Sequence, residues 1–201
     1  MTAKTITGLY DTYGAAEQTV RDLKAAGISD ADISLVGNRA HDATEHTSDA
    51  GTGAGTGAAV GGVAGAGVGI LTGLGLLAIP GVGPVVAAGW LVATAVGAVA
   101  GIGAGAATGG LIGAMTDSGI SRDHAHLYAE GIRRGGTLVT ARVDDTRAGS
   151  AEAIMNRHGR VDISVREKTY RDDGWNGFDE HAPPYTPAER LAVPFGKDKR
   201  L

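Results

Sequence analysis

Histidine and carboxylate side chains gather in two places where they could bind a metal ion. The stretch 41–46 holds two histidines, an aspartate and a glutamate, and His41 and Glu45 would share one face if it were helical. His124 and His126 are two residues apart on a predicted helix, so they point to different faces. We interpret the first group as a polar linker and the second as surface histidines, and we expect no metal site.

A glycine-rich stretch at 101–106 superficially resembles a dinucleotide-binding loop. Such a loop requires a preceding strand, a single following helix and an acidic residue further along the chain. Here the glycines continue for several turns, and no acidic residue follows until Asp117. The neighbouring Asp144 and Asp145 are explained by a helix cap, and no side chain lies in a recognisable nucleophile motif. We therefore expect no cofactor, no catalytic residues and no enzymatic activity.

The composition narrows the class of protein further. The 201 residues carry a net charge of -4, whereas a nucleic-acid binder usually has a basic face. There is no cysteine, which excludes disulfides and thiolate metal sites. The first residues lack the apolar core of a secretory signal, so we expect the cytoplasmic side of the membrane.

The most informative pattern is a glycine at every fourth position inside a segment without charge. Residues 50–116 contain no Lys, Arg, Asp, Glu or His, so the segment cannot form an ordinary solvated surface. Glycines at this spacing let two helix backbones approach closely, as in pairs of membrane helices. We expect burial in lipid or against other copies of the chain. The residues predicted to pack are Gly57, Gly61, Gly65, Gly69, Gly73, Gly89, Ala93, Gly97, Gly101, Gly105, Gly109 and Gly113.

A turn rich in proline and glycine divides this segment into the two arms of a predicted helical hairpin. The arms run over 57–79 and 85–115, and about twenty residues of helix span roughly the 30 Å of a bilayer core. Residues four apart advance about 40° per step around a helix, so the glycine ridge winds around each arm and requires several partners. The turn residues are Pro80, Gly81, Gly83 and Pro84.

The flanking regions each show a strand, a helix and a second strand. The tripeptide Asp-Ile-Ser occurs at 32–34 and again at 162–164, each time after a helix that ends in glycine. This order predicts an α+β protein, a ferredoxin-like βαβ-βαβ sandwich split by a long Gly/Ala-rich α-helical hairpin. The predicted strands are 5–10, 32–36, 137–143 and 161–165, and the predicted helices between them are 15–26 and 147–158, with a further helix after Ser121.

The same boundaries give the predicted organisation of the chain. The charge-free hairpin separates the two halves of the α/β domain, and its ends emerge on one side of that domain. The predicted parts are 1–38 as the first βαβ half, 39–49 as a polar linker, 50–116 as the glycine-zipper hairpin, 117–168 as a helix with the second βαβ half, and 169–201 as a flexible tail.

Two stretches of sequence resemble bacterial general stress protein 17M-like domains, also described as heat-induced stress proteins. They are the opening Thr7-Gly8-Leu9-Tyr10-Asp11 and the run from His126 to Val139 around Arg133-Arg134-Gly135-Gly136. Domains of this family often split a small α/β domain around a glycine-zipper segment. The resemblance covers about residues 4–167 and implies a stress-response setting, with no enzymatic site to carry over.

These observations together predict a non-enzymatic, stress-associated protein that forms a homo-oligomer through the glycine-zipper hairpin and associates with or inserts into a membrane. One alternative is a soluble shell or filament with the hairpins buried at its core. A second alternative is a small-ligand sensor module. The apolar residues near Phe195 in the tail offer a possible contact for a protein partner, and we expect no nucleic acid.

Overall fold

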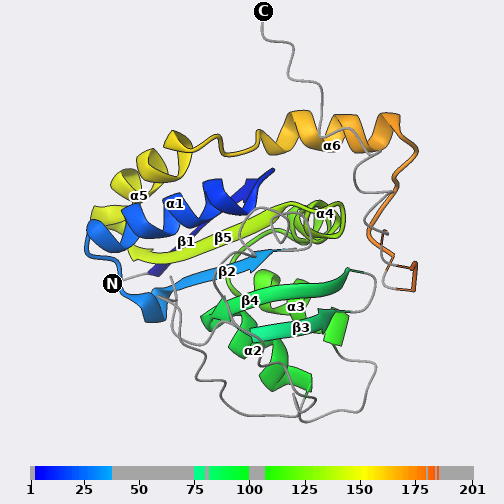
Figure 1. Cartoon of the computed structure of the whole chain (residues 1–201), viewed down its shortest axis with the longest axis horizontal. Helices are drawn as coiled ribbons and strands as arrows, with labels where there is room; N and C mark the ends of the chain where they lie inside the picture. The colour runs from blue at the N-terminus through cyan, green and yellow to red at the C-terminus, as the bar shows by residue number, and fades with distance from the viewer. Residues whose placement is uncertain are drawn as a thin grey trace, which may run out of the picture.

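The chain folds into a five-stranded antiparallel sheet with helices on both faces (Figure 1). The computed structural model describes residues 3–37, 75–79, 82–99, 107–179, 181–183 and 185. The predicted α+β class is confirmed. In chain order the elements are β1 (Ala3–Tyr10), α1 (Tyr13–Ala25), a 3-10 turn (Asp30–Asp32), β2 (Ile33–Gly37), β3 (Gly75–Ile79), β4 (Gly83–Gly89), α2 (Trp90–Val99), α3 (Ala107–Asp117), α4 (Arg122–Arg133), β5 (Thr137–Asp144), α5 (Asp145–Arg157) and α6 (Ile163–Asp172).

The strands lie in the order β1-β5-β2-β4-β3. β5 pairs with β1 along its whole length, from Ala3 opposite Asp144 to Tyr10 opposite Thr137. On its other side β5 pairs with β2. The hairpin formed by β3 and β4 extends the sheet beyond β2. The C-terminal half of the protein therefore supplies β5, and the N-terminal half supplies both of its neighbours, β1 and β2.

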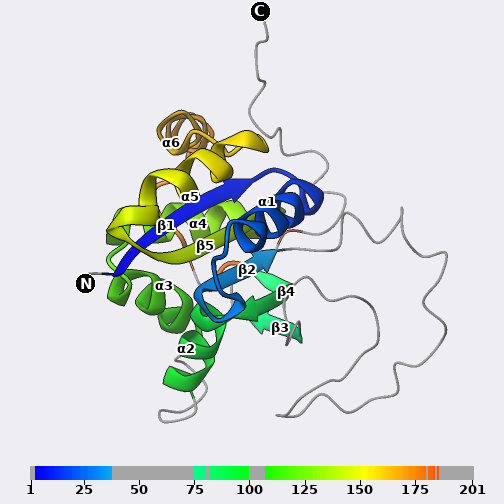
Figure 2. The same ribbon diagram turned by 90° about the vertical axis from the view of Figure 1, so that its left-hand side faces the viewer.

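Alternation along the strands divides the apolar side chains between two cores. On one face, α1 and α5 cover Ile6, Leu35 and Val139. On the other face, α2, α3 and α4 cover the strand residues Leu9 and Leu138. Figure 2 shows α1 and α5 on one side of the sheet and α2 with α3 on the other. Each face of the central strands is thus buried against its own layer of helices.

Side-chain caps fix where several helices begin. Thr12 accepts from the amide of Ala15 at the start of α1, and Ser121 does the same for His124 at the start of α4. Asp144 caps α5, and hydrogen bonds from Thr146 and Arg147 lower the pKa of its carboxyl to about 2. Each cap satisfies an amide that the first helical turn would leave without a partner.

The prediction of a strand at 161–165 is wrong, because α6 begins at Ile163. The side chain of Asp162 accepts from the amides of Ser164 and Val165, which starts a helix where the alternating residues suggest a strand. One strand-like bond remains, since the amide of Val161 donates to the carbonyl of Leu9 at 2.8 Å. The repeated Asp-Ile-Ser tripeptide thus forms a strand in one half and a helix start in the other.

The prediction of helical arms is also wrong where the two arms approach the turn. Residues 75–79 and 83–89 are strands, and the amide of Val82 donates to the carbonyl of Ile79 to close a β-hairpin. The β-branched Val85 and Val86 suit a strand, and pairing of β4 with β2 outweighs the apolar helical pattern. Among the described residues of the second arm, those of α2 and α3 are helical, and the first arm before Gly75 lies outside the described residues.

Gly89 marks the point where β4 approaches β2 most closely. Its φ is +96°, and an added Cβ would lie 2.2 Å from the carbonyl oxygen of Ile33. Gly27 also has a positive φ, +83°, but nothing lies within 4 Å of an added Cβ. We predict that Gly89→Ala lowers the free energy of unfolding by about 3 kcal/mol or more, and Gly27→Ala by only about 1 kcal/mol. Urea unfolding followed by circular dichroism measures both, and equal losses would contradict the close approach.

Candidate functional site

Only some of the residues predicted to pack in a glycine zipper, or to form the turn between its arms, lie in the part of the chain that the structure describes. Those inside it are distributed over a strand and two helices. Gly83, Pro84 and Gly89 belong to β4, Ala93 and Gly97 to α2, and Gly109 and Gly113 to α3. Those outside the described residues are Gly57, Gly61, Gly65, Gly69, Gly73, Pro80, Gly81, Gly101 and Gly105.

The helices α2 and α3 do meet through small residues. The residues in contact are Gly110 and Ala95, neither of which was predicted to pack. A Cβ added to Gly110 would lie 2.8 Å from the carbonyl oxygen of Ala95, so the two backbones are nearly in contact. Leu91 and Met115 are buried beside this crossing. In contrast, Ala93 is exposed and nothing lies within 4 Å of a Cβ added to Gly113. Packing between chains at Ala93 and Gly113 stays a prediction, and within one chain they leave an accessible surface of small residues.

The strand β3 lies at one edge of the sheet, and no described strand pairs with its outer side. Its sequence, Gly-Leu-Leu-Ala-Ile, contains neither a charge nor a proline. At the opposite edge, β1 receives a hydrogen bond from Val161. None of the helices in the described ranges combines the length and the apolar character that a bilayer crossing requires.

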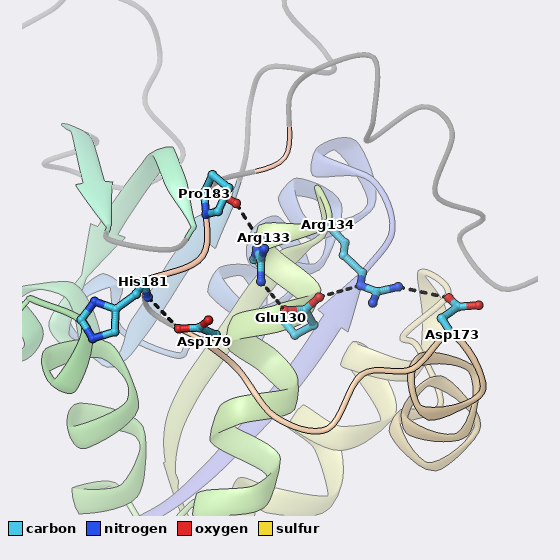
Figure 3. Close-up of polar contacts among 7 residues, drawn as sticks. All are labelled: Glu130, Arg133, Arg134, Asp173, Asp179, His181 and Pro183. Atoms are coloured by element: carbon cyan, nitrogen blue, oxygen red, sulfur yellow. Dashed lines mark hydrogen bonds and ion pairs between the residues drawn. The ribbon is translucent and has the colours of Figure 1, made fainter.

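A second candidate site is a cluster of charged side chains at the C-terminal end of α4, which the sequence analysis missed. Glu130 is 1% exposed, yet it accepts from Arg134 Nε at 2.7 Å and from Arg133 Nη1 at 3.4 Å. Figure 3 shows both guanidinium groups directed at this carboxylate. The spacing of three and four residues on one helix is the signal that could have predicted these pairs.

The cluster joins α4 to α6 and to the segment that follows α6. Arg134 Nη1 lies 3.3 Å from Asp173 Oδ2, and its guanidinium carbon lies 4.0 Å from the centre of the buried Tyr170 ring. Burial alone would lower the pKa of Arg134, but the hydrogen bond and the charge of Glu130 raise it above its usual value. Burial also raises the pKa of Tyr170, against the charge of Arg166. Arg134 therefore stays positively charged beside Glu130.

The carboxylates of this cluster are engaged by guanidinium groups, so their evident role is to hold elements together. Arg166 is likewise buried and binds Asp11 through two contacts of 2.7 and 3.0 Å, which connects α6 to the end of β1. Within the described ranges, no group of three or more histidine or carboxylate side chains could hold a metal ion.

A pocket of about 310 Å³ opens between the start of α5 and the turn before β2. Its charged side chains form pairs across the opening: Arg142 Nη2 lies 3.1 Å from Asp32, and Arg147 Nε lies 3.0 Å from Asp144. Arg142 also stacks on Trp90 at 4.5 Å. The charges that line the pocket therefore nearly cancel, and both of its arginines already form ion pairs with carboxylates.

The N-terminal part of the chain matches a known protein family. Residues 5–82 match the family described as the heat-induced stress protein YflT domain. This part of the chain is similar to a YflT domain. The match runs from β1 to the turn between β3 and β4, so the YflT domain begins in the α/β core and includes much of the charge-free segment. No curated protein and no solved structure is similar enough to the chain to count as a match.

The expected stress-protein identity is thus confirmed, and the glycine-zipper insertion stays a prediction. The second stretch on which the resemblance rested, from His126 to Val139, lies after the matched YflT domain. In the structure that stretch forms most of α4, the glycine turn and the start of β5. It carries Glu130, Arg133 and Arg134 of the charged cluster and the first residues of β5, the strand that lies between β1 and β2.

We predict opposite effects for two alanine substitutions on α3. Gly110→Ala forces α2 and α3 apart, which lowers the free energy of unfolding by about 1–2 kcal/mol even after the gain in helix propensity. The methyl group added by Gly113→Ala has no atom of the chain within 4 Å. This substitution therefore raises the free energy of unfolding by up to about 1 kcal/mol through the gain in helix propensity. Thermal and urea unfolding of both variants distinguishes the two positions. Equal stabilisation would show that α2 and α3 do not cross at Gly110.

We predict a large cost for removing the buried carboxylate of the charged cluster. Glu130→Ala leaves Arg134, 7% exposed, without its closest carboxylate and lowers the free energy of unfolding by about 3–5 kcal/mol. Glu130→Gln keeps a hydrogen-bond acceptor, so its free energy of unfolding falls by less than that of Glu130→Ala. The matched control is Glu167→Ala, which removes an exposed pair with Arg171 and costs under about 0.5 kcal/mol. A similar loss in both alanine variants, measured by urea unfolding, would contradict the structural role of Glu130.

Proposed function

We propose that the chain is a non-catalytic, stress-associated protein that self-associates through its charge-free segment. The stress association rests on the YflT domain at residues 5–82. The self-association rests on one observation: β3 is an apolar edge strand, and no described strand pairs with its outer side. The absence of a catalytic role is part of the proposal, supported by carboxylates that are held in ion pairs around Glu130.

An edge strand offers unpaired amide and carbonyl groups to any extended chain nearby. Proteins that stay monomeric usually protect such edges with lysine, proline, a bulge or a covering element. The residues of β3 include none of these charges and no proline. Two copies of β3 can pair antiparallel about a two-fold axis, which uses the same surface on both chains and brings no like charges together. The product would be a sheet that continues from one copy into the next.

Small residues on the helices offer a second contact of the kind expected of a glycine zipper. Ala93 on α2 and Gly113 on α3 are accessible within one chain, and Thr94 is exposed beside Ala93. Close packing at such positions requires another helix, since a small residue leaves room for a partner backbone. We propose that helices of neighbouring copies occupy this surface once the β3 edges have paired.

A soluble assembly and a membrane-associated one differ in what covers the remaining charge-free surface. We propose that other copies of the chain, more than lipid, cover this surface. The exposed residues Ala93 and Thr94 are small, so burying them in hydrocarbon removes little apolar area from water. Membrane association is the alternative, and it predicts particles that change size in detergent. A small-ligand sensor is a third possibility, with the pocket beside Arg142 and Arg147 as its site.

We also propose that the core derives from a ferredoxin-like sandwich that lacks its last strand. The order β1-β5-β2 is the one expected when the second βαβ half inserts its first strand between the strands of the first half. The bond from Val161 to Leu9 lies where a fourth strand would pair with β1. The hairpin of β3 and β4 extends the opposite side of the sheet instead.

We predict that a single charge on β3 dissociates the assembly. Leu77→Lys places a lysine in the middle of the edge strand, where it disfavours pairing with a second copy. The particle mass, measured by light scattering after gel filtration and by native mass spectrometry, should fall several-fold. The matched control is Thr94→Lys, which adds the same charge at an exposed position of α2.

The comparison of these two variants separates the possible contacts. Loss of mass in Leu77→Lys alone supports pairing at the edge, whereas loss in Thr94→Lys alone moves the contact to the helices. A wild-type chain that is monomeric at all concentrations, with and without detergent, would contradict self-association. A mass that changes only on adding detergent would favour the membrane-associated alternative.

A further inference from the structure

The segment after α6 crosses the C-terminal end of α4, and Arg133 contacts it in two ways. Arg133 Nη2 donates to the carbonyl oxygen of Pro183 at 3.2 Å. The guanidinium carbon of Arg133 also lies 4.8 Å from the centre of the Tyr185 ring, and that of Arg134 lies 6.0 Å from it. Figure 3 shows the carbonyl of Pro183 turned toward Arg133. One side chain therefore binds both a proline carbonyl and the aromatic ring two residues later.

The receptor side of this contact is held in place independently of the segment. Glu130, 1% exposed, accepts from both arginines, so a buried carboxylate fixes their orientation. Arg133 itself is only 12% exposed. Its Nε is buried and has no hydrogen-bond partner among the described residues, so its guanidinium contacts the segment through Nη2 and through its planar face. A preformed site of this kind loses little entropy on binding.

The segment that occupies the site is short, and it is joined to α6 through Gly174 and Gly177. Both glycines have a positive φ, 88° and 155°, so the chain changes direction twice before it reaches α4. Asp179 accepts from the amide of His181 at 2.9 Å, which shapes the start of the segment. Phe178 packs against the apolar core, so only the residues after it need to leave α4, while α6 stays anchored through Tyr170 and Arg166.

The chemistry of the contact defines the ligand class. Proline restricts the backbone in advance, so an extended proline segment loses little conformational freedom when it binds. Sites for such segments combine a hydrogen-bond donor for a carbonyl with a planar group against an aromatic ring or the proline itself. The sequence of the segment is Ala182-Pro183-Pro184-Tyr185, and Arg133 supplies both the donor and the planar group.

We propose that the Arg133–Arg134 surface of α4 is a binding site for an extended Pro-Tyr segment, filled within one chain by Pro183 and Tyr185 and open to the same segment of a second copy. Every copy carries both the site and its ligand, so exchange preserves all the contacts and links the chains. This inference does not depend on pairing at β3, because it uses none of the charge-free residues.

The site is tested with a fluorescent peptide that spans residues 178–190, added to the full-length protein. Because its own segment competes at a high local concentration, wild type should bind the peptide at least tenfold more weakly than Tyr185→Ala. Adding Arg133→Ala to the Tyr185→Ala acceptor should weaken binding by roughly tenfold to a hundredfold, since it removes the hydrogen bond and the ring contact. Arg133→Lys, which keeps the charge, should recover only part of this loss.

The matched control is Arg171→Ala in the same acceptor. Arg171 also lies over an aromatic ring, that of Trp175 at 5.8 Å, but it sits on the exposed side of α6 and should leave peptide binding unchanged. A circular dichroism spectrum confirms that each variant is folded, and Glu130 keeps its contact with Arg134 when Arg133 is replaced. The proposal is overturned if the peptide fails to bind at millimolar concentration, or if Arg171→Ala weakens binding as much as Arg133→Ala.

Exchange between copies is tested by mixing two chains, each defective in one half of the contact. A chain with Arg133→Ala retains the segment, and a chain with Tyr185→Ala retains the site. Both also carry Leu77→Lys, so that pairing at β3 does not contribute. Cross-linking should give mixed pairs in at least tenfold excess over pairs formed by either chain alone. Peptide binding without an excess of mixed pairs would refute exchange and restrict the site to its own chain.

Discussion

The position of β5 between β1 and β2 is the constraint on which the rest of the structure depends. β1 and β2 lie close together in the sequence, yet neither pairs with the other, and both pair with a strand from the far end of the chain. The chain between β2 and β5 must therefore return to the sheet before β5 can pair, and its described part adds β3, β4, α2 and α3 to the same fold. Its return through α3 and α4 brings Gly131 against Leu9, where an added Cβ would lie 2.6 Å from a side-chain carbon.

Because of this arrangement, the residues that match the YflT family do not form the sheet and its core by themselves. The matched residues 5–82 contain β1, α1, β2 and β3, but the strand that joins β1 to β2 lies beyond them. The same holds for α5, whose Ile154 and Met155 belong to the core beneath α1. The YflT domain of this protein is thus completed by residues 137–157, and its apolar edge and its core belong to one folded unit.

The charged cluster around Glu130 holds α4 against the end of α6 in the same folded unit. Burying Glu130 and Arg134 carries a desolvation cost, which only close pairing and additional hydrogen bonds can offset. Here the pair is shared among α4, α6 and the segment that follows, so one buried carboxylate orients three parts of the chain. The apolar β3 edge and the polar α4 surface then provide two chemically distinct contacts on one protein.

The sequence by itself determined the parts that depend on local spacing or on composition. Alternation and caps predict β1, α1, β2, β5 and α5 close to their observed bounds, and the charge-free segment marks the region that requires a partner. Tertiary structure decided the rest. The strand β4 forms because its residues 86–89 pair with β2 and its first residues pair with β3, and Ile163 starts a helix because Asp162 caps it where pairing with β1 ends. Arg133 and Tyr185 meet only because α6 and two glycines bring the chain back across α4, a contact between residues that no local pattern connects.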